Sequence, residues 1–221
     1  MLELDHVFIC VSDEPNVTRT LTEFGLNLSS RQIHQGQGTA NRCAFFDNAY
    51  LELLVRDDDR DLQSKQVKAV SLWKRMRWRD TNASPFGVSF RFTEMTEQNI
   101  PIATRPYNAP FLPKGITIPV ATPQDSVYEP LIFLSLVAKA PIEQNLPNRS
   151  LLKHNNSQHQ ITGLKITTLT CEQSEQLQWF CDRDLISVRV GNKHHAELEL
   201  DNNTEGQIIN FNPVLPLSIR W

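Results

Sequence analysis

The segment 34–54 constrains the fold more than any other part of the chain, because its pattern predicts two strands joined by a tight turn. Residues 38–46 and 50–56 are rich in strand-forming residues, and an Asp-Asn pair between them favours the turn. Glu52 interrupts the second strand, with leucines on both sides. A carboxylate buried among leucines is costly unless it meets a cation, a metal or a hydrogen-bond donor. The hairpin therefore predicts a polar partner for Glu52.

The first strand offers such a partner. In residues 2–11 both alternating faces are mainly apolar, which is typical of a central strand covered on both sides. His6 lies among these apolar residues, and we interpret His6 and Glu52 as facing one pocket. Strand alternation puts Glu52 on the same face as Tyr50 and Leu54. A histidine in an apolar strand is often only a hydrogen-bonded core residue, and that alternative stays open.

The predicted elements repeat in one order. Strand, helix and further strands follow one another three times along the chain, with the middle copy degraded, which predicts an α+β fold built from repeated βαβββ modules. We expect paired modules in residues 1–140, a connector in 141–159 and a third module in 160–221. Helices are expected over 13–24, 65–78 and 172–181. Further strands are expected over 86–92, 115–121, 130–137, 161–169, 186–190, 196–200 and 207–211.

Composition excludes several classes of protein. The chain has 221 residues, of which 40% are hydrophobic, and a net charge of −3 without any cluster of Lys and Arg, which argues against nucleic acid as a partner. No apolar run approaches the roughly 20 residues of a membrane span, and no signal peptide is recognisable. The four cysteines lack the spacing of metal sites and are expected to be reduced. These features predict a cytoplasmic globular protein.

Four segments resemble one known family: LDHVFICV, HQGQGTANRCAFF, YLELL and WKRMRWRDTNASPFGVSFR. With this spacing of DHV, GTANR and YLEL, the chain resembles the glyoxalase-like domain proteins of the vicinal oxygen chelate superfamily. The resemblance covers about residues 1–92; beyond them it rests on the order of elements and a PLIFLS strand. It implies βαβββ modules whose curled mixed sheets surround a pocket, usually with a divalent metal such as Zn, Mn, Fe or Ni.

The resemblance also implies where metal ligands would lie. His6 and Glu52 match the ligand positions of the first module, and Glu52 is the candidate acid or base. Gly87 and Leu134 stand at the corresponding positions of the second module, so the expected metal site is incomplete. A catalytic divalent ion usually has three or more protein ligands. The remaining candidates for a third ligand are His154, His159, His194, His195 and a residue of a second subunit.

Four further residues are candidates for substrate binding. Thr39, Asn41 and Arg42 could offer hydrogen-bond donors to an anionic or carbonyl-bearing ligand. Alternation puts Thr39 and Asn41 on one face of the strand and Arg42 on the other, so a regular strand cannot bring all three to one site. Arg91 is either an exposed strand residue or a charge in the cavity of the second module.

Three functions are compatible with these features. The first is a small-molecule pocket centred on His6 and Glu52 that works without a complete metal site. The second is a metal-dependent lyase, isomerase or dioxygenase, as the resemblance implies. The third is an interaction module without a ligand. We also expect a homodimer, because a third module would leave one curved sheet without a partner.

Overall fold

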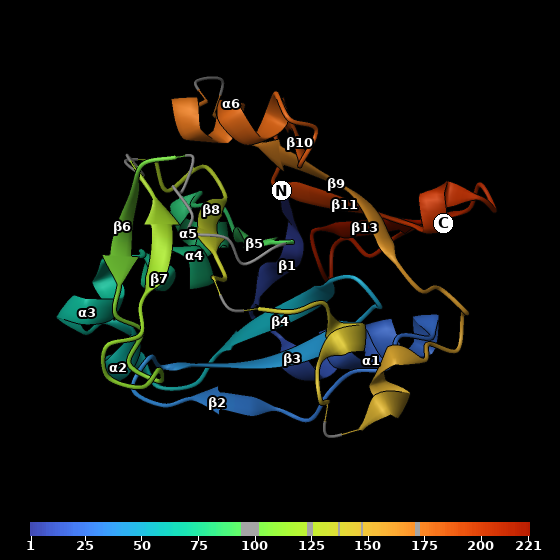
Figure 1. Cartoon of the computed structure of the whole chain (residues 1–221), viewed down its shortest axis with the longest axis horizontal. Helices are drawn as coiled ribbons and strands as arrows, with labels where there is room; N and C mark the ends of the chain where they lie inside the picture. Colours follow the sequence, from blue (N-terminus) through green and yellow to red (C-terminus); the bar gives the residue numbers. More distant parts are fainter. Residues whose placement is uncertain (94–101, 123–125, 137, 147, 171–172) are drawn as a thin grey trace.

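The computed structural model describes residues 1–93, 102–122, 126–136, 138–146, 148–170 and 173–221. Its strands form two mixed sheets, and the predicted α+β class is confirmed. The larger sheet is curled, and it runs from β2 at the bottom of Figure 1 to β6 at the left. Its strands are β1 (Leu2–Val11), β2 (Gln32–His34), β3 (Thr39–Phe45), β4 (Tyr50–Arg56), β5 (Phe86–Phe92), β6 (Thr104–Tyr107), β7 (Ile118–Ala121) and β8 (Leu131–Leu134).

The larger sheet consists of two halves with the same topology. Its strand order is β2-β3-β4-β1-β5-β8-β7-β6. In the first half β1 runs parallel to β4, in the second half β5 runs parallel to β8, and the halves meet where β1 and β5 pair antiparallel. The two strands at the ends of the order, β2 and β6, were not predicted. Each has only three or four residues, too few for a clear pattern.

The helix of the first half forms where it was predicted. It is α1 (Glu14–Phe24), and it begins after Asp13, whose side chain accepts a hydrogen bond from the backbone N–H of Asn16. It ends at Gly25, which has a φ of 110°. Val17 and Leu21 of this helix are buried in the main core.

The predicted helix over 65–78 is broken into short pieces. It contains α3 (Lys65–Lys68), α4 (Leu72–Met76) and the first residue of α5 (Trp78–Thr81), and another short helix, α2 (Asp59–Leu62), precedes it. Separate N-caps at Asp58 and Ser64 start α2 and α3, and Ser71 has a left-handed backbone that prevents α3 from continuing. These turns follow the curve of the sheet, and their buried side chains share a core with Phe8, Leu54 and Val120 on its concave side.

The smaller sheet reproduces part of the larger one. It consists of β9 (Ile161–Thr168), β10 (Ser187–Val190), β11 (His195–Leu200), β12 (Ile208–Asn210) and β13 (Leu217–Arg220), in the order β10-β9-β11-β13-β12. Parallel and antiparallel pairings alternate across this sheet in the same sequence as in the central series β4-β1-β5-β8-β7. The third segment thus resembles two shortened halves more than one additional module. The connector and this segment also contain η1 (Pro141–Glu143), η2 (Arg149–Leu152), α6 (Glu175–Cys181) and η3 (Asp201–Asn203).

The two sheets share one core. Phe180 of α6 stacks on Phe90 of β5 with ring centroids 4.5 Å apart, and Phe24 of α1 contacts Phe211 and Trp221. Figure 1 shows α6 above the larger sheet and the smaller sheet beside β1. The apolar face that was expected to require a partner chain is therefore covered within the chain. The homodimer remains a prediction, which light scattering can test.

Two other expectations concern cysteines and membranes. Cys10, Cys43 and Cys181 are free thiols, and Cys171 lies outside the described residues. Burial raises the pKa of the Cys10 thiol to about 12, so it stays protonated. Within the described ranges, every helix is too short or too polar to cross a membrane.

Candidate functional site

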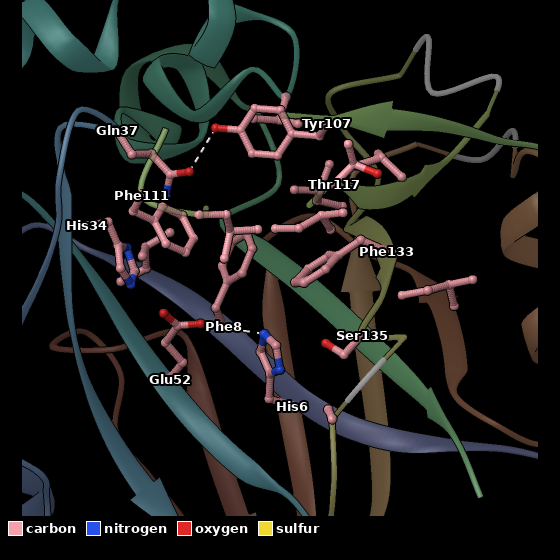
Figure 2. Close-up of a pocket in the computed structure, with 18 of the residues that line it drawn as sticks. His6, Phe8, His34, Gln37, Glu52, Tyr107, Phe111, Thr117, Phe133 and Ser135 are labelled. Atoms are coloured by element: carbon pink, nitrogen blue, oxygen red, sulfur yellow. Dashed lines mark hydrogen bonds and ion pairs between the residues drawn. The ribbon is translucent and has the colours of Figure 1, made fainter. Parts of the chain in front are cut away.

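A pocket of about 630 Å³ occupies the concave side of the larger sheet. Figure 2 shows His6, Glu52 and His34 at one end of it, with aromatic rings across from them. Most of its wall is apolar, and the two halves of the sheet contribute to it together. The wall includes Phe8, Leu54, Ile118, Val120, Leu131 and Phe133.

His6 reaches the pocket because β1 contains an irregularity. The pairing of β1 with β5 shifts between Leu4 and His6, which leaves Asp5 as the extra residue of a β-bulge. Regular alternation would group Leu4 with His6, but Leu4 packs against the main core, on the side of Val7. The bulge also lets two consecutive side chains meet: Nδ1 of His6 lies 2.7 Å from a carboxylate oxygen of Asp5.

Asp5 fixes the orientation of the His6 ring. Its carboxylate is buried, with 2% of the residue exposed, and it also pairs with Arg91 at 3.2 Å. Burial by itself raises the pKa of Asp5, but the hydrogen bond and charge of His6, together with Ser135 and Arg91, outweigh this effect and lower it. Because ionised Asp5 only accepts hydrogen bonds, Nδ1 of His6 carries the proton and Nε2 points toward Glu52.

Glu52 lies on β4, the strand paired with β1, and its side chain converges with His6 as expected. One carboxylate oxygen is 3.6 Å from Nε2 of His6, and the other accepts a hydrogen bond of 2.7 Å from Nδ2 of Asn41. Tyr50 of the same strand face stacks on the His6 ring at 4.5 Å. The amide oxygen of Asn41 is buried and has no partner among the described residues. The polar end of the pocket thus offers more acceptors than donors.

Three of the candidate binding residues do not line this pocket. Arg42 points to the outer side, where it pairs with Glu14 at 2.8 Å. Arg91 is buried behind the pocket and pairs with Glu3 and Asp5, so it positions Asp5 and is not available to a ligand. Thr39 is fully buried, and its hydroxyl contacts the ring of His34 instead of the cavity. Of the four candidates only Asn41 reaches the cavity.

His34 is a pocket residue that the sequence patterns did not reveal. Its Nδ1 lies 2.9 Å from the hydroxyl of Thr39, and its ring stacks on Phe111 with centroids 4.6 Å apart. Burial lowers the pKa of His34, which favours the neutral ring. The Gly-rich segment after it could have signalled this role: a Cβ on Gly38 would lie 2.2 Å from the backbone oxygen of Asp58, so only glycine allows this close approach.

The other four histidines lie elsewhere. His154 accepts a hydrogen bond from the backbone of Asn27, and His194 and His195 contact Asn82 and Ser218. His159 is exposed, with its backbone bonded to Asp201. None of these candidates for a third metal ligand lines the pocket.

The donor set does not fit a catalytic divalent metal. Two potential metal ligands, His6 and Glu52, converge, and the contact from Asp5 to His6 is of the kind that orients metal-binding imidazoles. At Gly87, however, the space that a side chain would need is filled: a Cβ there would lie 2.1 Å from the Phe8 ring. Across the part of the chain that the structure describes, no three His, Cys, Asp or Glu residues are grouped to hold a metal ion.

Comparison with solved structures supports the fold. A crystal structure of a hypothetical protein from Staphylococcus aureus is 11% identical, covers 100% of this chain and 99% of that chain, and superimposes with a TM-score of 0.60. A methylmalonyl-CoA epimerase in complex with methylmalonyl-CoA and NH4+ is 15% identical, with coverages of 63% and 97%, but its TM-score is only 0.40. A hypothetical protein from Bacillus halodurans C-125 is 15% identical, with coverages of 62% and 96% and a TM-score of 0.41. The last two similarities are too weak to bear on function.

Comparison with sequence families is more specific. No curated protein sequence matches the chain significantly. The model of the glyoxalase-like domain family matches residues 4–179, which includes β1, β4 and both sheet halves. This match spans well over half of the chain and agrees with the motifs and with the curled sheet. The chain therefore belongs to the glyoxalase-like domain family.

Proposed function

We propose that the chain binds a small molecule with an apolar body and a polar head that donates hydrogen bonds and carries no negative charge. The observation that carries this proposal is the chemistry of the pocket wall. Among the described residues, no Lys or Arg lines the pocket, whereas the Glu52 carboxylate faces it. A buried carboxylate needs a donor or a cation, and an anionic ligand would supply neither.

The charges around the polar end support the same choice. Three carboxylates, those of Glu3, Asp5 and Glu52, share one guanidinium and one imidazole, those of Arg91 and His6. Negative charge therefore exceeds positive charge around the His6 ring, which disfavours a carboxylate or phosphate head group. The unpartnered amide oxygen of Asn41 is a second acceptor beside Glu52.

Three probes with the same alkyl chain test the charge preference. We expect octanamide and octylamine to raise the melting temperature and to bind in calorimetry, and octanoate to do neither. Glu52→Gln should narrow the difference between octanamide and octanoate, because the amide removes the negative charge and keeps the shape. Glu199→Gln is the matched control, since that carboxylate lies on the smaller sheet outside the pocket. Tighter binding of octanoate than of octanamide would contradict the proposal.

A second candidate is proton transfer on the bound molecule. The line from Asp5 through His6 to Glu52 joins two carboxylates by one imidazole, an arrangement that can hold and move a proton. In this function Glu52 would act as the acid or base. Incubation of the recovered natural ligand in deuterated water with wild-type protein and with Glu52→Gln tests it: only the wild type should exchange a carbon-bound hydrogen for deuterium.

A further inference from the structure

A chain of buried hydrogen bonds leads from the far side of the pocket to His34. The hydroxyl of Tyr107 on β6 donates to the side-chain oxygen of Gln37 at 2.7 Å. The amide nitrogen of Gln37 donates to the hydroxyl oxygen of Thr39 at 2.9 Å. The same hydroxyl lies 2.9 Å from Nδ1 of His34. Figure 2 shows the Tyr107–Gln37 contact on the side of the pocket away from His6.

The direction of each bond follows from the one before it. Burial raises the pKa of Tyr107, so its oxygen keeps the proton that it donates. Gln37 then uses its oxygen toward Tyr107 and its nitrogen toward Thr39. Thr39 is fully buried, and within the described structure its hydroxyl has Gln37 and His34 as its side-chain partners. Because Thr39 accepts from Gln37, its own proton is satisfied by donation to His34.

This direction fixes the tautomer of His34. If Nδ1 accepts from Thr39, the proton of the neutral ring sits on Nε2. His6 has the opposite arrangement, since its Nδ1 donates to Asp5. A histidine that binds a metal through Nε2 needs that nitrogen unprotonated. With its proton on Nε2, His34 therefore differs from a metal-ligating histidine of this kind.

We propose that His34 is a hydrogen-bond donor to an oxygen of the ligand, held in this role by the chain Tyr107–Gln37–Thr39. The inference rests on the proposed function and narrows its ligand class. Glu52 requires a donor and His34 an acceptor, and Figure 2 shows the Glu52 carboxylate between the two histidine rings. The head group that satisfies both carries an N–H or O–H beside a carbonyl-type oxygen, as in a primary amide. An amine satisfies only Glu52.

Nitrogen NMR of histidine-labelled protein tests the tautomer without any ligand. The unprotonated nitrogen of an imidazole resonates far downfield of the protonated one, and the spectrum of His34→Gln identifies which signals belong to His34. We expect wild-type His34 to show an unprotonated Nδ1 and a protonated Nε2. Thr39→Val should abolish this preference because valine has no hydroxyl, and Thr39→Ser should keep it. A protonated Nδ1 in the wild type, or an unchanged spectrum in Thr39→Val, overturns the inference.

Binding of octanamide and octylamine tests the specificity. His34→Ala should weaken octanamide by roughly three- to tenfold, the change expected for one neutral hydrogen bond, and octylamine by much less. Thr39→Val should have the same selective effect, and Thr39→Ser should bind like the wild type. Equal losses for both probes would overturn the assigned role of His34. If neither probe binds the wild type, the proposed function fails, while the NMR result still decides the tautomer.

Discussion

The two halves of the larger sheet have the same topology but opposite chemistry. The first half supplies His6, Glu52, Asn41 and His34 to the pocket, whereas the second half supplies mainly Phe133 and other apolar side chains. On the parallel strand that faces the pocket, the first half carries Glu52 on β4, whereas the second half carries Leu131 and Phe133 on β8. Leu134, which was expected at the position of Glu52, belongs to the main core. A repeated backbone can thus provide one polar wall and one apolar wall. The difference favours an amphipathic ligand over symmetric coordination of a metal.

The largest effect should come from breaking the polar half at Asp5. Asp5→Asn removes the charge that pairs with buried Arg91 and orients His6. We expect the free energy of unfolding to fall by about 3 kcal/mol, because removing the buried partner leaves Arg91 with only the more exposed carboxylate of Glu3. Denaturant unfolding measures this change. Glu3→Gln is the control, since Glu3 pairs with the same arginine from a more exposed position and should cost far less.

In the apolar half, a substitution at Gly87 should lower the stability of the fold. Gly87→Ala places a methyl group against the Phe8 ring, and we expect a loss of about 2 kcal/mol from overpacking. Phe8→Leu alone also costs stability, but the double variant should lose less than the sum of the two single variants. Thermal unfolding of the three variants gives the coupling. Strict additivity would show that Phe8 does not occupy the space beside Gly87.

The pH dependence of stability sharpens the comparison, because His34 belongs to the polar half. Burial lowers the folded-state pKa of His34, as it does for His154, His194 and His195. Below the ordinary value near 6.5 the unfolded chain therefore binds protons that the folded chain does not. We expect the free energy of unfolding to decrease as the pH falls from about 7 toward about 5.

Denaturant titrations at several pH values measure that slope. His34→Gln should make it shallower, whereas His159→Gln, at an exposed position, is the control variant. A stability that rises on acidification would contradict the expected sign.

The smallest effect on stability is expected for Glu52→Gln. Glutamine keeps the shape of the side chain and can still accept from Asn41, so we expect a change within about 1 kcal/mol. The same variant should alter the charge preference for ligands. A large loss in Glu52→Gln would indicate that Glu52 serves the fold as well as the pocket.

His6→Ala, which empties space on the central strand, should lower the free energy of unfolding by about 1–3 kcal/mol more than a neutral surface change.

The sequence by itself determined the local patterns. Alternation placed Glu52 on the pocket face with Tyr50, and the motifs around His6 were sufficient to indicate the family. Strands with strong apolar patterns were predicted within a few residues, because burial on one or both faces leaves a periodic signal. Gly87 already indicated that the second half lacks a counterpart of His6, but the assignment of Leu134 as the counterpart of Glu52 was wrong by one residue, because the register places Phe133 there.

Only the tertiary structure decided which side chains meet. The bulge at Asp5 changes the phase of β1 and joins Asp5 to His6, and no single-strand pattern reveals such an extra residue. Arg42 and Arg91 looked available but are paired with carboxylates that lie far away in sequence, at Glu14 and Asp5. The ring of His34 lies in the pocket wall against Phe111, which follows β6 in the other half of the sheet. Pairings between distant segments depend on how the strands are brought together, and local periodicity carries no information about that.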